Sequence, residues 1–199
     1  MKKKSLFKNK TQMIVYGIIF TVCIILFIVI GQFDFEKDID TEAKKFHNLY
    51  DLVPNENLYI FSSSAEVLEL LNGRSGIIFM GFPSNKWSNY YAELLNKAGI
   101  ELGLDKIYYY DFQSDRDESN GTYETIVNKL KMYVPVMDTG LQDIQAPTIV
   151  MVKKGEIIGY FDDTSIIKGN ATPETYYTEY QKGIIYEGFK TAITNYLKR

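Results

Sequence analysis

The side chains that could do chemistry in this sequence gather in one short stretch, Asn85-Lys86-Trp87-Ser88, which follows an apolar run and a Gly-Phe-Pro-Ser loop. A serine hydroxyl attacks a substrate only with a base beside it, and His47 is the only histidine of the chain. No Ser-His pair is therefore expected at Ser88. Serine and asparagine are instead favoured helix N-caps, each worth about 1 kcal/mol. Helix capping and recognition of a partner are both open roles for this stretch, and Trp87 is either an exposed anchor or a side chain packed against the loop that contains Pro147.

The sequence has few residues for cysteine or metal chemistry. Cys23 is the only cysteine, and it lies inside a long apolar run. The rest of the chain can form no internal disulfide and present no thiolate, which excludes dithiol oxidoreductase chemistry there. A single histidine allows no histidine-based zinc or copper cluster, and the acidic segment that begins at Asp115 lacks the glycine and glutamate positions of a calcium loop. We expect no catalytic residue, no metal and no cofactor, and hence not an enzyme.

The apolar run Met13–Ile30 contains no charged residue. As a helix it rises about 27 Å, close to the hydrocarbon thickness of a bilayer. Five lysines precede it and acidic residues follow it, which favours a cytoplasmic N-terminus. A cleaved signal peptide is the rival interpretation, but no small-residue cleavage site follows the run. The expected order is a cytoplasmic basic tail (1–12), a transmembrane helix (13–31), a stalk with an N-terminal helix (32–54) and an extracytoplasmic domain (55–199).

Charge is distributed unevenly along the chain. The formal net charge is −3, yet residues 1–30 carry +5, so the remaining residues carry −8. An acidic domain has no basic stripe for nucleic acid, and nucleic-acid binding is set aside. A composition that is 46% hydrophobic and 15% aromatic can fill a core. One globular domain outside the membrane is therefore expected.

The pattern of apolar residues predicts alternating strands and helices that end in a hairpin and a last helix. Such an order indicates an α/β fold with a mixed sheet that helices cover on both faces. Tyrosines in the last helix either cover the sheet or form an interaction surface. The expected strands are Leu58–Ser62, Gly76–Gly81, Lys106–Phe112, Pro147–Val152 and Glu156–Phe161, and the expected helices are Thr41–Val53, 63–73, Lys86–Ala98, Thr122–Tyr133 and 173–197.

This order of elements resembles the thioredoxin-like superfamily. The frame that surrounds Asn85 and Ser88 is similar to the branch of bacteriocin transport accessory and thiol-disulfide isomerase-like proteins, in which a strand leads into a Cys-x-x-Cys helix. Asn85 and Ser88 stand at the two cysteine positions of that motif. The residues that match the frame are Gly81, Pro83, Ser84 and Trp87, and the stretch Tyr108–Glu118 adds to the resemblance.

A second stretch, Gln145-Ala146-Pro147, resembles the cis-proline hairpin of the superfamily. The resemblance implies that the residue before the proline pairs its main chain with an extended substrate segment, a contact that needs no sulfur. Gln145, Ala146, Pro147 and Trp87 are therefore the candidate peptide-binding residues. The alternative is that Pro147 only shapes the hairpin.

The resemblance thus implies a membrane-anchored, redox-inactive thioredoxin-like protein. It would bind a peptide or protein outside the membrane and serve the export, maturation or immunity of a secreted peptide. One alternative is a scaffold in a thiol-disulfide exchange pathway, working with a cysteine-bearing partner. Another is unrelated chemistry on the same fold, against which the lack of a convergent nucleophile, base or metal-ligand set argues.

Overall fold

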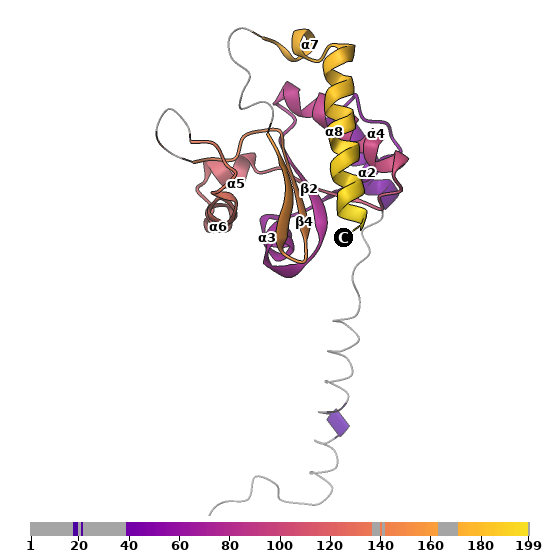
Figure 1. Cartoon of the computed structure of the whole chain (residues 1–199). Helices are drawn as coiled ribbons and strands as arrows, with labels where there is room; N and C mark the ends of the chain where they lie inside the picture. Colours follow the sequence, from indigo (N-terminus) through magenta and orange to yellow (C-terminus); the bar gives the residue numbers. More distant parts are fainter. Residues whose placement is uncertain are drawn as a thin grey trace, which may run out of the picture. The chain divides into compact units, whose positions relative to one another are not determined.

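A computed structural model describes residues 39–136, 140, 142–162 and 171–198, together with 18, 19 and 21 (Figure 1). The chain divides into two units, Met1–Lys37 and Asp38–Arg199, and the second unit contains the sheet. Apart from 18, 19 and 21, the expected membrane span at 13–31 lies outside the described residues, as does the basic tail at 1–12. Within the described part of the chain, no helix is both long and apolar enough to cross a membrane. The anchor stays a prediction.

The second unit alternates strands with helices and closes with a hairpin followed by two helices (Figure 1). The elements, with their bounds, are α2 (Ile39–Leu49), β1 (Tyr59–Phe61), α3 (Ser64–Gly73), β2 (Gly76–Met80), α4 (Lys86–Glu101), β3 (Ile107–Tyr110), α5 (Gln113–Asp117), α6 (Gly121–Leu130), β4 (Thr148–Lys153), β5 (Glu156–Phe161), α7 (Pro173–Tyr176) and α8 (Glu179–Lys198).

The five strands form one mixed sheet in the order β1-β3-β2-β4-β5. β3 runs parallel to both β1 and β2, while β4 runs antiparallel to β2 and β5 antiparallel to β4. At the centre, Phe79 of β2 lies opposite Tyr109 of β3 and Ile149 of β4. The predicted mixed α/β sheet with flanking helices is confirmed.

Each face of the sheet has its own apolar core. Along β2, alternate side chains point to opposite faces, so Ile77 and Phe79 join the core under α2, α4 and α8. Ile78 and Met80 join the core under α3 and α6. All of β2 is buried, as the wholly apolar sequence of this strand predicts. The central strand therefore fixes the position of the loop that follows it.

Helix α2 packs directly on this sheet. Phe46 is fully buried and stacks on Tyr59 of β1 with ring centroids 3.8 Å apart. Tyr50, just after the helix, stacks on Phe46 from the other side at 4.5 Å. The Phe46–Tyr50 separation lies in the range in which aromatic pairs contribute about 0.5–1.5 kcal/mol beyond their burial. The α2 helix is thus part of the same core as the strands.

Two segments differ from the prediction. The polar stretch after β3 forms the short helix α5, and the last helix is not continuous. Tyr177 has a non-helical backbone, with φ −79° and ψ 58°, and ends α7. The Thr178 hydroxyl then accepts a hydrogen bond from the Gln181 backbone N–H at 3.2 Å, which starts α8 anew. The single helix predicted from the apolar spacing is therefore wrong at this point.

Candidate functional site

The candidate site lies where the parallel strands end. β2 ends at Met80, and the loop that follows leads into α4, whose N-cap is Asn85. β3 ends beside it at Tyr110, and the two segments stay joined because the Gly81 N–H donates to the Tyr110 carbonyl at 3.2 Å. In open α/β sheets, ligands bind outside the carboxyl ends of parallel strands. This edge is therefore the place to look for function.

Asn85 connects this edge to the loop before β4. Its side-chain Oδ1 accepts a hydrogen bond from the Ser88 backbone N–H at 3.2 Å and so caps α4. Its Nδ2 donates to the main-chain carbonyl of Ala146 at 2.9 Å. The Ala146–Pro147 peptide bond is cis. The structure therefore brings Asn85, Ala146 and Pro147 together, as the resemblance implied.

Ser88 has a different environment. It is fully buried in the first turn of α4, and its Oγ has no hydrogen-bond partner among the described residues. A Cβ built on Gly81 would lie 2.9 Å from that Oγ, so a side chain at Gly81 requires a shift there. The serine hydroxyl is enclosed against the β2–α4 loop and cannot reach an external substrate in this conformation.

Trp87 is half-buried, and its two aromatic neighbours lie at the end of α7 and just after it. Its ring lies edge-on to Tyr176, with centroids 5.5 Å apart, and tilted to Tyr177 at 5.7 Å. Tyr177 also stacks on Tyr90 of α4 at 4.7 Å. The sequence offered two roles for Trp87, an exposed anchor or packing against the Pro147 loop, and these contacts with α7 were not foreseen. Lys86, next to Trp87, is exposed.

The loop before β4 is held from within the domain. Thr148 is buried, and its hydroxyl donates to the Gln145 carbonyl at 2.6 Å. The next carbonyl, that of Ala146, accepts the Asn85 amide. Both carbonyls that precede Pro147 therefore carry a side-chain hydrogen bond, and a proline has no N–H to add. The carbonyls of Gln145 and Ala146, which the sequence suggested for main-chain pairing, are therefore both engaged within the domain, and peptide binding there stays a prediction.

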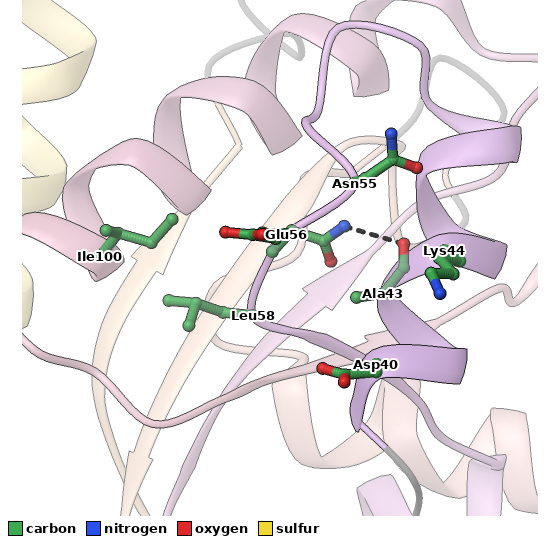
Figure 2. A pocket seen from close by; sticks show the side chains of 8 residues that line it. Asp40, Ala43, Lys44, Asn55, Glu56, Leu58 and Ile100 are labelled. Carbon is green, nitrogen blue, oxygen red and sulfur yellow. Dashed lines mark hydrogen bonds between the residues drawn. The ribbon is translucent and has the colours of Figure 1, made fainter.

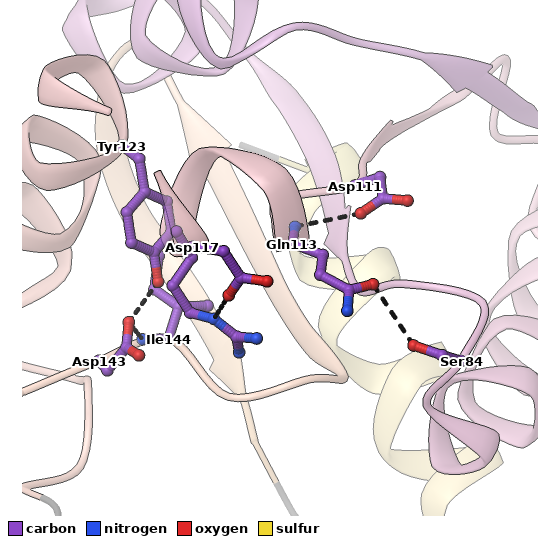
Figure 3. Close-up of polar contacts among 8 residues, drawn as sticks. Ser84, Asp111, Gln113, Asp117, Tyr123, Asp143 and Ile144 are labelled. Atoms are coloured by element: carbon purple, nitrogen blue, oxygen red, sulfur yellow. Dashed lines mark hydrogen bonds and ion pairs between the residues drawn. The ribbon is translucent and has the colours of Figure 1, made fainter. Parts of the chain in front are cut away.

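A polar network that the sequence reasoning missed borders the site (Figure 3). The Gln113 N–H donates to the Asp111 carboxylate at 3.1 Å, and the Ser84 hydroxyl donates to the Gln113 side chain at 3.4 Å. Desolvation by the surrounding protein raises the pKa of Asp111 above its ordinary value, although the Gln113 N–H and the Tyr109 hydroxyl oppose the shift. An acid directly after an apolar strand was the available signal for this network.

A second set of polar contacts supports the loop before β4. The Tyr123 hydroxyl donates to the Asp143 carboxylate, which also accepts the Ile144 N–H at 2.9 Å (Figure 3). Arg116 of α5 lies over the rings of Phe82 and Phe112, 5.2 and 5.6 Å from their centroids. These contacts join α5 and α6 to both loops of the site.

The remaining candidate side chains, His47 and Asp115, are hydrogen-bonded within the domain. His47 lies in α2, and its Nδ1 is hydrogen-bonded to the carbonyl of Val53 at 2.6 Å. Within the described ranges, no three His, Cys, Asp or Glu side chains gather as a metal site. The Asp115 carboxylate, which starts the calcium-like segment, accepts hydrogen bonds from the Tyr110 hydroxyl and the Asn120 amide at 2.6 and 3.0 Å.

A separate hollow of about 510 Å³ lies before the start of β1 (Figure 2). Asn57 stands in its wall, and the Asn57 amide donates to the carbonyls of Ala43 and Pro54 at 2.9 and 2.8 Å. These bonds tie α2 to the β1 strand, so the polar groups here serve the fold. The hollow lies at the amino end of the parallel strands, opposite the candidate site.

The fold and the site define a class, a mixed α/β domain with flanking helices that is compatible with the thioredoxin-like fold. No known family model matches the sequence, and no curated protein matches it.

Proposed function

We propose that this chain is a membrane-anchored, redox-inactive thioredoxin-like protein that binds an extended peptide or protein segment outside the membrane. Its nearest branch would be the bacteriocin transport accessory and thiol-disulfide isomerase-like proteins. The N-terminus would lie in the cytoplasm and the domain outside a single membrane span. The bound segment would belong to a secreted peptide during export or maturation.

One observation carries this proposal, the contact between Asn85 and Ala146. It keeps the start of α4 within hydrogen-bond distance of the loop before β4, at the carboxyl edge of the parallel strands. Extended segments are recognised by main-chain hydrogen bonds, which give affinity without sulfur. Trp87, half-buried in the first turn of α4, supplies an apolar neighbour of the kind that anchors partners.

The proposal that the protein is redox-inactive rests on Asn85 and Ser88, neither of which carries a thiol. Disulfide exchange needs a thiolate that attacks and a second thiol that resolves the mixed disulfide. Asn85 has no nucleophilic atom, and the Ser88 hydroxyl is enclosed. The proposed binding surface, formed by Trp87, Gln145, Ala146 and Pro147, would therefore hold a peptide segment without reacting with disulfides of that segment.

Site-specific crosslinking tests the proposal. A photoreactive p-benzoylphenylalanine replaces Lys86, which is exposed beside Trp87, in the full-length chain in lipid nanodiscs. The probe is fluorescein-labelled insulin B chain, reduced and alkylated so that it is extended and free of thiols. The matched control places the same residue at Lys129, which is exposed on α6. We expect crosslinks at position 86 and background at 129, and equal or absent labelling at 86 overturns the proposal.

A further inference from the structure

Asn85 makes its two side-chain hydrogen bonds with opposite ends of one carboxamide. The Oδ1 end accepts from the Ser88 backbone N–H and belongs to the helix cap. The Nδ2 end donates to the Ala146 carbonyl, 61 residues away in sequence, at 2.9 Å. Capping needs only the oxygen end, because an N-cap acts as an acceptor. The nitrogen end therefore makes a separate contact.

A carboxamide presents the same donor as a peptide group. When a strand pairs with an exposed main chain, its backbone N–H donates to a carbonyl of the acceptor segment. The Asn85 amide supplies such a donor to Ala146 at ordinary hydrogen-bond length. Asn85 is also only half-buried. Ala146 itself is only 9% exposed, so a segment from solvent reaches its carbonyl only by displacing the Asn85 amide that is bonded to it.

We propose that Asn85 is an internal competitor of the bound segment. When the surface is empty, its amide occupies the Ala146 carbonyl, and a backbone N–H of the arriving segment replaces it. The proposal rests on the proposed function and adds how affinity at that site is set. An exchange of one neutral hydrogen bond for another lowers the affinity by about threefold to tenfold relative to an open carbonyl.

Two substitutions separate the competing contact from the cap. An ionised aspartate is as good an N-cap as asparagine but has no N–H to donate, so Asn85→Asp keeps the cap and removes the side-chain donor from the Ala146 carbonyl. Asn85→Ser also caps the helix and is neutral, but its side chain is too short to hold Ala146. Asn128→Asp, at an exposed position on α6, controls for the added charge.

The experiment measures binding of the labelled, alkylated insulin B chain to the full-length chain in nanodiscs by fluorescence anisotropy. We expect Asn85→Asp and Asn85→Ser to bind about threefold to tenfold more tightly than the wild type, and Asn128→Asp to bind like the wild type. In the wild type, the NMR signals of the Asn85 side-chain amide should move as the probe saturates. Thermal unfolding of each variant checks that the domain stays folded.

The outcomes distinguish this inference from the proposed function. If the wild type binds the probe and both Asn85 variants bind with equal or weaker affinity, the competitor role is wrong while peptide binding stands. If the Asn85 variants bind and the wild type does not, the competitor role is supported in its strongest form. If no variant binds and the Asn85 amide signals never move, both proposals fail.

Discussion

The hydroxyl of Tyr50 donates a hydrogen bond of 3.1 Å to the hydroxyl of Tyr109, inside the core between α2 and the sheet. Tyr59 is buried beside them, and its hydroxyl donates to the Ala92 carbonyl of α4 at 2.8 Å. Burial raises the pKa of all three phenols well above its ordinary value. These hydrogen bonds inside the core exist only while the phenol hydroxyls are protonated.

Stability should therefore fall in alkaline solution. In the unfolded chain tyrosine ionises near pH 10, whereas the buried phenols stay protonated, so the unfolded state binds fewer protons. The protonated phenols therefore make their full contribution to the free energy of unfolding below about pH 10. Above that pH the contribution decreases, by about 1 kcal/mol for each buried tyrosine between pH 10 and 11. Urea unfolding at about pH 9 and pH 11 measures the loss.

Tyr59→Phe provides the matched comparison for this pH dependence. Removing one buried phenol should shrink the loss between pH 10 and 11 by about 1 kcal/mol. Tyr180→Phe, at a site that is 78% exposed, should leave it unchanged. If the wild type and Tyr59→Phe showed the same pH dependence, the buried Tyr59 phenol would not be a source of the alkaline loss of stability.

Gly81 and Ser88 should be energetically coupled. A Cβ at Gly81 would lie 2.9 Å from Ser88 Oγ, so Gly81→Ala should destabilise the domain by about 1–3 kcal/mol. Ser88→Ala removes a buried hydroxyl without a partner among the described residues, and should raise the free energy of unfolding by up to about 1 kcal/mol. In the Ser88→Ala background, Gly81→Ala should cost less, and a double-mutant cycle of unfolding free energies measures the difference. Strict additivity would show that the two sites do not contact.

The sheet could be predicted because its signals are local. The apolar run of β2 predicts a strand buried on both faces, and Ser63 with Glu66 predicts a capping box, which the structure confirms with both hydrogen bonds. Strand and helix order then followed from the alternation of such patterns. These features depend on neighbours within a few residues.

The parts that could not be predicted depend on distant partners. Helix α5 has no apolar stripe, and its Arg116 packs on Phe82 of the β2–α4 loop as well as on Phe112, the N-cap of the helix itself. The second hydrogen bond of Asn85 goes to Ala146. No spacing rule covers a side chain and a carbonyl that meet only in the folded state. The resemblance brought the two loops together, but it could not say which atoms would bond.

Cysteines introduced at positions 85 and 88 would test the site geometry directly. The wild-type chain should show no insulin reduction above background, because it has no thiol at the site. In a Cys23→Ser background, the pair Asn85→Cys and Ser88→Cys should form an intramolecular disulfide on mild oxidation. Mass spectrometry with thiol labelling detects the bond, and each single variant serves as its control. If both thiols of the double variant stayed free after oxidation, the placement of both residues at one helix N-terminus would be wrong.

Trp87 gives a direct optical test of the α7 contact because it is the only tryptophan of the chain. Tyr177 is buried against Trp87 and Tyr90, so Tyr177→Ala should leave the indole more exposed to water. Its emission should then shift to longer wavelength, and acrylamide should quench it more strongly. Tyr180→Ala, an exposed tyrosine on α8, is the matched control and should leave both readouts unchanged. If Tyr177→Ala behaved like this control, the Tyr177 ring would not cover Trp87 in solution, and a peptide would reach the indole without displacing that ring.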